Sequence, residues 1–348
     1  MVNVARRLTI LACVVLTLVA GGLAAFWLHG AERLRTTAKL WEDQWRAQGS
    51  EISHENFQIY GFPLSFRVQL DKPVVGQPQI PSPWHWQGPP VRLRLSPFAP
   101  RGRAVFPGAH RLDLTVVGVP VALAITAGHA ETDYFGRGSE SRYGVKGEKL
   151  SVAIDGRPPM TIDNLDFEVL HLRGITDHLK TSARFAFEIE DIRLPQGSLP
   201  EQFQNQPIDL ARLRGEVHGP LKADFNRPTV TAWRDLGGTV EVTTLELRWG
   251  ALKIVATGTV ALDDKLQPLA ALTATMTGFN EAIDALTVTG AIQKNEADAA
   301  KALLNLLAKP PRLLGGPPEI SMPVTIQNQR LALGPVALMT LPPIQWPD

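Results

Sequence analysis

Hydrophobic and polar residues follow two different patterns along the chain. Residues 8–28 form a run of 21 residues without Asp, Glu, Lys or Arg. After residue 50, apolar and polar residues instead alternate in many short stretches, for example 91–95, 165–169 and 245–249. Alternation with a period of two is typical of antiparallel strands that bury one face. The pattern therefore predicts one N-terminal helix followed by a mainly β chain.

The apolar run is long enough to cross a membrane. A helix of this length extends about 30 Å, which is the thickness of the hydrocarbon core. Arg6 and Arg7 precede the run, and basic residues beside a span stay on the cytoplasmic side. We therefore expect a single-pass anchor with the bulk of the chain outside the cytoplasm. The predicted anchor residues are Leu8, Leu18, Trp27 and Leu28. Trp27 lies near the end of the span, where a residue of the aromatic belt is expected.

Two other interpretations of this segment stay open. A cleaved signal peptide has a shorter apolar region of about 7–15 residues, although the Gly-Leu-Ala sequence at 22–24 is compatible with a cleavage site. A lipoprotein would use Cys13 as the lipidated residue, but only five residues separate Arg7 from Cys13. We prefer the anchor to both, with Cys13 as an ordinary residue of the span.

Beyond the anchor, composition and turn residues divide the chain. Helix-forming residues follow the span directly and place Trp41 and Trp45 on one helical stripe, so a juxtamembrane helix is predicted to pack on the domain, a partner or lipid headgroups. Helix is expected again only near the C-terminal end, as a turn at 281–286 and a helix at 295–308. The predicted division is 1–30 for the cytoplasmic tip and anchor, 31–49 for the juxtamembrane helix, 50–200 for a first β-rich half and 201–348 for a second.

Composition excludes several classes of function. The 348 residues carry 35 Lys and Arg against 34 Asp and Glu, whereas a protein that binds nucleic acid through phosphates is usually more basic. The single cysteine excludes an intrachain disulfide and a cysteine-based zinc site. Charge is unevenly distributed, with 11 basic and 6 acidic residues in 61–150, and 4 basic and 9 acidic residues in 161–210. Either the basic part attracts anionic headgroups or the two parts pair across one sheet, and we favour pairing.

Catalytic motifs are absent from the sequence. It contains no Gly-x-Ser-x-Gly elbow, no His-Glu-x-x-His and no Gly-Lys-Ser/Thr phosphate loop. His171 and His178 would share a face only in a helix, yet their segment alternates like a strand. Asp263 and Asp264 occupy a turn position, where Asp favours local backbone bonds. We therefore predict no catalytic, cofactor or metal site and no enzyme, with an envelope hydrolase as an unfavoured alternative.

Several short motifs recur in a set order along the chain. They are Gly61, Phe62, Pro63, Trp249, Gly250, Gly258 and Asp263, together with Gly334-Pro335 and 341–344. In this order they resemble a bacterial envelope family known as domain of unknown function 2125. The resemblance covers nearly the whole chain and brings no catalytic residues with it. It implies a protein of the bacterial inner membrane with its bulk in the periplasm.

Strands with one apolar face need somewhere to bury it, and a sandwich, a barrel or a long curled sheet would each serve. Residues 245–290 are similar, more weakly, to AsmA-like proteins, which are membrane-anchored β-groove proteins of envelope lipid handling. This second resemblance implies an elongated, curled antiparallel sheet with few short helices, whose groove holds acyl chains. The expected partners are then the inner membrane and lipid or another envelope protein. The alternative is a structural or interaction protein with a packed β interior and no ligand.

Overall fold

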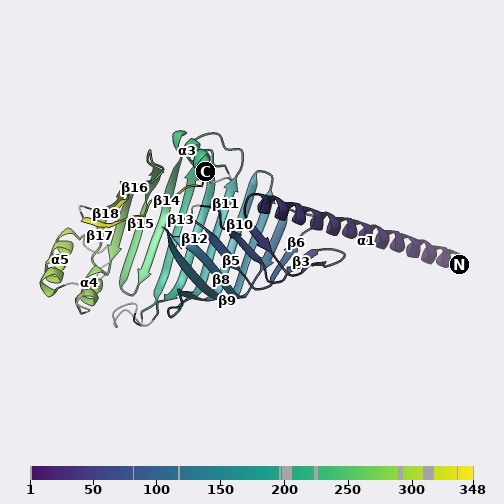
Figure 1. The fold of residues 1–348 in the computed structure, drawn as a ribbon, viewed down its shortest axis with the longest axis horizontal. Helices are drawn as coiled ribbons and strands as arrows, with labels where there is room; N and C mark the ends of the chain where they lie inside the picture. Colours follow the sequence, from purple (N-terminus) through teal and green to yellow (C-terminus); the bar gives the residue numbers. More distant parts are fainter. Residues whose placement is uncertain are drawn as a thin grey trace.

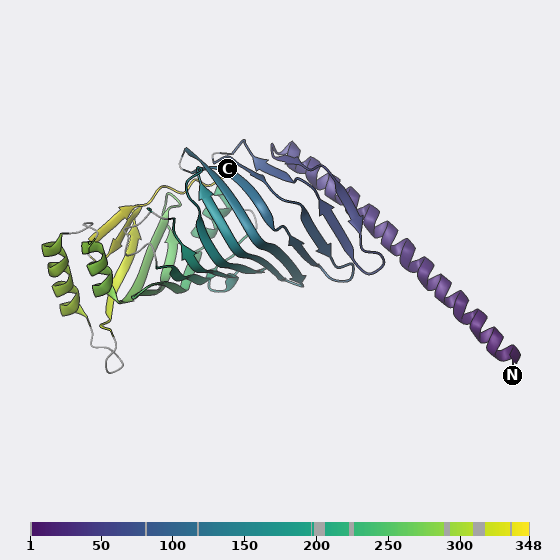
Figure 2. The same ribbon diagram turned by 90° about the horizontal axis from the view of Figure 1, so that it is seen from below.

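A long N-terminal helix and one large antiparallel sheet make up most of the molecule (Figures 1 and 2). The computed structural model describes residues 2–80, 82–116, 118–195, 197, 206–222, 226–288, 293–308, 317–334 and 336–347. The sheet is curved and is not closed into a barrel. The predicted fold class, a mainly β chain with an N-terminal apolar helix and few short helices, is confirmed.

Helix α1 (Val2–Ala47) covers both the predicted anchor and the predicted juxtamembrane helix without a break. It ends where Gly49 adopts a φ of 82°, a left-handed conformation that glycine reaches without steric cost. The part of this helix from Cys13 onward is by length and composition apolar enough to cross a membrane, which is compatible with an anchor or a signal sequence.

The larger part of the sheet follows the order of the chain, because each strand pairs with the next one. All pairs in this series are antiparallel, so adjacent strands run in opposite directions. The strands are β10 (Glu140–Ile154), β11 (Met160–Leu172), β12 (Thr181–Arg193), β13 (Ile208–His218), β14 (Thr239–Trp249), β15 (Leu252–Leu262), β16 (Pro268–Thr277), β17 (Ile320–Gln327), β18 (Arg330–Leu333) and β19 (Val336–Thr340).

The sheet divides in two at β9 (Val119–Arg137), the longest strand in the described residues. One edge of β9 pairs along its length with β10, while its other edge is shared by two strands. Its first half pairs with the branch β8 (Gly108–Val116), β5 (Trp84–Gln87), β4 (Val74–Gln77) and β1 (Glu51–Ser53). Its second half pairs with the branch β7 (Arg101–Val105), β6 (Val91–Leu95), β3 (Phe66–Leu70) and β2 (Phe57–Tyr60), which we call the anchor branch.

Helix α1 packs against the anchor branch at the point where it leaves the sheet. Gly30 lies directly over the ring of Phe66, where no side chain would fit, and Ala31 is buried. The indole of Trp27 stacks on Phe66 and donates a hydrogen bond to the carbonyl oxygen of Ser65 at 3.0 Å. These contacts fix the helix to β3 and to the turn that precedes it (Figure 1).

The two faces of the sheet differ in polarity, as a period of two requires. One continuous row of cross-strand neighbours, which defines the apolar face, runs through Val145, Phe167, Phe187, Leu213, Leu245, Ala256, Ala274 and Met322. On the other face, the equivalent row begins with Lys146, Asp166, Glu188, Arg212 and Glu246, which we call the charge ladder. Register thus sorts the side chains of strands β10 to β14 onto two faces of opposite character.

Much of the apolar face is not covered by other protein. Its large side chains, such as Phe167, Phe187 and Leu245, are only half-buried. Among the described elements, strands contact mainly their hydrogen-bonded neighbours, and no second sheet packs across this face. The solvent-accessible surface of 21695 Å² also greatly exceeds the roughly 14,000 Å² expected for a compact 38.0 kDa protein. The sheet is therefore a single curved layer.

Three short helices accompany the sheet in the described residues. Helices α4 (Phe279–Val288) and α5 (Lys294–Leu307) confirm the helical segments predicted near the C-terminal end. The expectation that helix recurs only there is wrong, because α3 (Arg227–Asp235) lies between β13 and β14. The side chain of Asn226 caps α3 by accepting from the amide of Thr229 at 3.0 Å, and Pro228 occupies the first turn.

The predicted boundary between two β-rich halves, at 200/201, lies outside the described residues. The strands on its two sides, β12 and β13, pair directly with each other. Both halves therefore contribute to one sheet, and the division at 200/201 stays a prediction.

Candidate functional site

An apolar cavity of about 310 Å³ lies between the apolar face and the segments that cover one end of it. Strands β11 to β15 form its floor, and α3 with the C-terminal tail forms its cover. Its volume falls at the lower end of the range found for small-molecule sites. The residues that line it are Val169, Ala183, Phe185, Val217, Leu221, Thr229, Val230, Trp233, Val240, Val260, Ala261, Leu262 and Trp346.

Two tryptophans of the cover present apolar ring surface to the cavity. The indole nitrogen of Trp233 donates to the carbonyl oxygen of His218 at 2.9 Å, and that of Trp346 donates to the carbonyl oxygen of Leu266 at 2.9 Å. Both N–H groups are therefore satisfied by backbone. Because no lining side chain carries a charge, the cavity suits hydrocarbon and offers little to a polar ligand.

Backbone contacts hold the tail over the sheet. The side chain of Gln267 bonds to both the amide and the carbonyl oxygen of Ile344, at 2.8 and 3.1 Å. The carbonyl oxygen of Pro347 accepts from the amide of Arg227 at 2.6 Å, at the start of α3. The tail is thus attached both to the β15–β16 turn and to the helix, which places Trp346 over the cavity.

Two glycines leave room for the aromatic side chains of this site. A side chain at Gly238 would overlap the indole of Trp233, and one at Gly215 would lie 2.6 Å from the Phe185 ring. Trp233 is buried as a result, with 7% of its surface exposed. These cavity residues were not predicted from the sequence. The available signals were the Asn226 cap and the helical spacing of Val230 and Trp233.

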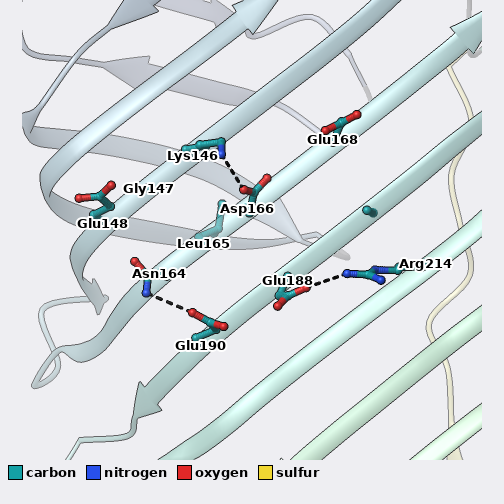
Figure 3. Close-up of a pocket in the computed structure, with 11 residues that line it drawn as sticks. Lys146, Gly147, Glu148, Asn164, Leu165, Asp166, Glu168, Glu188, Glu190 and Arg214 are labelled. Carbon is teal, nitrogen blue, oxygen red and sulfur yellow. Dashed lines mark hydrogen bonds and ion pairs between the residues drawn. The ribbon is translucent and has the colours of Figure 1, made fainter.

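A second hollow, of about 470 Å³, lies on the polar face over strands β10 to β13 (Figure 3). Two of its carboxylates are bonded from a neighbouring strand: Asp166 by Lys146 at 3.1 Å, and Glu190 by the side-chain amide of Asn164 at 3.1 Å. Glu188 accepts from Arg214 at 3.3 Å on its other side. These pairs join adjacent strands and indicate a structural role for the hollow.

Arg212 is the centre of the charge ladder. Its guanidinium binds both carboxylate oxygens of Glu188 at 2.7 Å and one oxygen of Glu246 at 3.1 Å. The hydrogen bond from Arg212 lowers the pKa of Glu188 below its usual value. The hydroxyl of Thr181 likewise donates to Glu216 and lowers its pKa. These carboxylates are held ionised, which suits ion pairing and not proton transfer near neutral pH.

No group of three or more His, Cys, Asp and Glu side chains in the described residues is arranged to hold a metal ion. His171 lies 3.5 Å from the carbonyl oxygen of Leu221, whereas His178 pairs with Asp177 at 3.9 Å, so the two histidines have separate surroundings. The side chain of Asp263 accepts from the amides of Lys265 and Gln267, both at 2.8 Å. It therefore closes the β15–β16 turn, as expected for Asp in a turn.

The motif residues that carry the family resemblance lie in two separate regions. Gly61, Phe62 and Pro63 form the β2–β3 turn, where the ring of Phe62 lies 5.9 Å from that of Trp27. Four more lie in or beside β14 and β15: Trp249 and Gly250 at a hairpin turn, Gly258 packed closely on the β16 backbone, and Asp263 in the next turn. The structure therefore assembles them into turns and strand contacts and not into one site.

The residues taken as anchor markers all lie on α1. Leu18 and Leu28 are exposed, with 70% and 63% of their surfaces accessible. Trp27 instead contacts the β2–β3 turn and β3, as described above. Leu8, Arg6 and Arg7 belong to the helix, and their side chains lie outside the described part of the structure. The exposed apolar surface of the free helical segment is what a membrane would cover.

Comparison with known proteins gives one match. A family model described as "Uncharacterized protein conserved in bacteria (DUF2125)" matches residues 27–342. The searches of curated proteins and of solved structures found no match. The matched range begins at the tryptophan where α1 meets the sheet, includes the whole sheet and ends in the C-terminal tail. The chain belongs to this bacterial family, domain of unknown function 2125.

Proposed function

We propose that the protein is anchored in the bacterial inner membrane by α1, exposes its sheet to the periplasm and binds the acyl chain of a lipid on the apolar face. The role is one of binding or conveying lipid in the envelope, without catalysis. The observation that carries this proposal is the uncharged cavity of about 310 Å³, which lies on the apolar face of strands β11 to β15.

The uncovered apolar face supports an acyl chain as the ligand. A sheet that buries its apolar side chains against a second layer gains stability from that burial, whereas this one leaves Phe167, Phe187 and Leu245 partly exposed. Each methylene group that a ligand removes from water there would contribute about 0.8 kcal/mol. An apolar ligand would thus cover the partly exposed side chains of this face and stabilise the sheet.

The same observation disfavours a protein whose β interior is fully packed. Such an interior requires the large side chains of the apolar face to be buried from both sides, but Phe167, Phe187 and Leu245 on this face stay partly exposed. The tail and α3 cover only one end of the face. We therefore favour lipid binding over a purely structural role.

The experiment fills the cavity with a larger side chain and measures whether bound lipid is lost. Val260 lines the cavity, whereas its neighbour Thr259 is exposed on the opposite face. Wild type, V260W and T259W would be purified full-length in a mild detergent, and bound lipid would be measured by native mass spectrometry. Wild type and T259W are expected to retain lipid, and V260W to lose most of it.

A second substitution that fills the same cavity guards against the possibility that V260W simply fails to fold. Val240 lies opposite Val260 on the neighbouring strand and lines the same cavity. V240W should lose lipid in the same way, and thermal unfolding identifies any variant that fails to fold. Wild type without lipid, or folded filling variants with as much lipid as T259W, would refute the proposal.

A further inference from the structure

We propose that the anchor branch carries a binding surface for the headgroups of anionic phospholipids in the membrane from which α1 emerges. Three arginines lie side by side on adjacent strands: Arg67 is the direct partner of Arg94, and Arg94 of Arg103. We call these three the arginine row. The inference rests on the proposed membrane anchor, but it concerns a site separate from the apolar cavity.

The arginine row is unusual because like charges that face each other destabilise a sheet. Directly opposite residues have Cβ atoms about 4.5–5.5 Å apart, so their charges repel. Arg92 and Arg101 lie on the same face, two residues along their strands from members of the row. All five arginines are exposed. A positive surface of this density is stabilised when anions approach it.

Acidic side chains of the sheet leave most of this charge uncompensated. On β9, Glu131 pairs with Arg103 at 3.4 Å and also with His129 at 3.1 Å, while Asp133 lies opposite Arg103. On the other side, β2 places the neutral Gln58 and Tyr60 opposite β3. Among the described residues, Arg67, Arg92 and Arg94 make no ion pair or hydrogen bond through their side chains.

The position of the row points to membrane lipid as the source of the anion. The strand ends next to the row lead into two turns, 61–65 and 96–100, which lie beside α1 where it leaves the sheet (Figure 1). The ring of Phe98 stacks on Phe26 of the helix at 6.0 Å. The row lies one residue from Phe66 and Leu95, so about 3 Å along the strands separates it from these ends.

The tips of the same turns expose apolar side chains toward this end of the helix. Phe62, Leu64 and Phe98 expose 55%, 64% and 70% of their surfaces. Apolar tips followed directly by arginines match the order of a bilayer surface, in which acyl chains lie below charged phosphates. A guanidinium also binds phosphate oxygens bidentately, which favours phospholipid phosphate as the bound group.

The experiment compares two variants with the same change in charge. The row variant is R67Q/R94Q/R103Q. The control is R214Q/R248Q/K253Q, which removes three exposed basic side chains from the same face of strands β13 to β15, far along the sheet from α1. Full-length proteins would be placed in nanodiscs of equal phosphatidylglycerol and phosphatidylcholine. Native mass spectrometry would then measure the ratio of the two lipids that remain bound.

Wild type and the control are expected to retain phosphatidylglycerol in preference to phosphatidylcholine. In the row variant, the ratio of bound phosphatidylglycerol to phosphatidylcholine should fall at least about fivefold. One basic side chain near an anionic surface already contributes about this factor. High salt, about 1 M, should reduce the wild-type preference, because the Debye length is then about 3 Å. Removing repulsion between arginines should not unfold the variant, so the readout is not confounded by stability.

Each alternative result has a separate meaning. If the row variant keeps the wild-type preference, or if the control loses it equally, the headgroup site is refuted while the anchor stands. If the full-length protein fails to insert into nanodiscs, the anchor and the headgroup site are refuted together. Loss of cavity lipid in V260W is independent of both results, because that variant leaves the arginine row intact.

Discussion

The charge ladder and the arginine row lie on the same face of one sheet, but they differ in how the charge of their arginines is compensated. In the ladder, Arg212 is placed between Glu188 and Glu246, and both carboxylates are bonded to it. In the row, Arg94 is placed between two further arginines. Pairing within the sheet therefore accounts for the ladder, whereas it leaves most of the charge of the row uncompensated.

This contrast bears on the two interpretations of the uneven charge. Pairing between the basic and acidic segments does occur, because Lys146 binds Asp166 at 3.1 Å and Arg142 binds Glu168 at 3.2 Å. The anchor branch, however, contributes five of the 11 basic residues of 61–150 and receives little acidic charge in return. Pairing therefore accounts for one part of the basic segment, and the headgroup proposal concerns the other part.

The largest expected difference between the two regions follows from removing one arginine of each. R212M would leave the carboxylates of Glu188 and Glu246 without their main partner, so the free energy of unfolding should fall by about 1–3 kcal/mol. R94M would remove only repulsion and should stay within about 0.5 kcal/mol of wild type or stabilise it. Thermal unfolding of the full-length proteins in detergent measures both. An equal loss in the two variants would contradict the contrast.

A smaller effect is expected at acid pH. The pKa of Glu188 and that of Glu216 are lowered in the folded protein, chiefly by hydrogen bonds from Arg212 and Thr181. Their contribution to stability is therefore complete above the unfolded value of about 4.3 and is lost as pH falls through the lowered folded values. The free energy of unfolding of wild type should decrease over this range.

The control for this pH dependence is again the pair of arginine variants. R212M should show a shallower decrease than R94M, because Arg212 is the main cause of the Glu188 shift. His110, whose pKa is lowered by burial, loses stability on protonation in both variants and so cancels from the comparison. Parallel pH profiles for R212M and R94M would show that the Arg212 bond does not set the pKa of Glu188.

The sequence predicts the two faces of the sheet but not the partners across it. Period-two alternation at 165–169 and 245–249 correctly assigns the faces, and the excess of arginine in 61–150 is visible by counting. The repulsive contact between Arg67 and Arg94 is not visible, because β3 pairs with β6 and not with its neighbour β4 along the chain. Register between distant strands depends on the whole sheet.

The apolar cavity was missed for a related reason. Its floor comes from strands that the alternation identifies, but its cover joins α3 to a tail more than 100 residues later in the chain. Helix α3 is one short element whose cap residue, Asn226, follows a loop-like stretch without periodicity. Contacts such as that between Gln267 and Ile344 depend on tertiary structure alone.

Reversing one charge within the row should slightly raise the stability of the fold and weaken its preference for anionic lipid. R94E would place a carboxylate between Arg67 and Arg103, which face it directly across β3 and β7. Opposite charges in such positions contribute about 0.2–1 kcal/mol, so the free energy of unfolding should rise by about 0.5 kcal/mol. The same change should weaken the preference for phosphatidylglycerol in nanodiscs. A variant that is destabilised would show that the arginines do not repel each other in the folded protein.

The smallest expected effect is a change in stability with salt, which distinguishes charge repulsion in the arginine row from charge pairing in the ladder. Raising the ionic strength to about 1 M shortens the Debye length to about 3 Å and screens exposed charges. In R212M the arginine row still repels, and the acidic side chains of the ladder, such as Asp166 opposite Glu188, have lost their central cation. Salt should therefore stabilise this variant by a few tenths of a kcal/mol. In R94M the row is broken and the ladder is intact, so the same salt should leave the melting temperature unchanged or lower it slightly. Hofmeister effects are controlled by using chloride salts for both variants, since any general effect of the salt then shifts them equally. Identical salt responses would mean that the contrast between the row and the ladder has no energetic consequence.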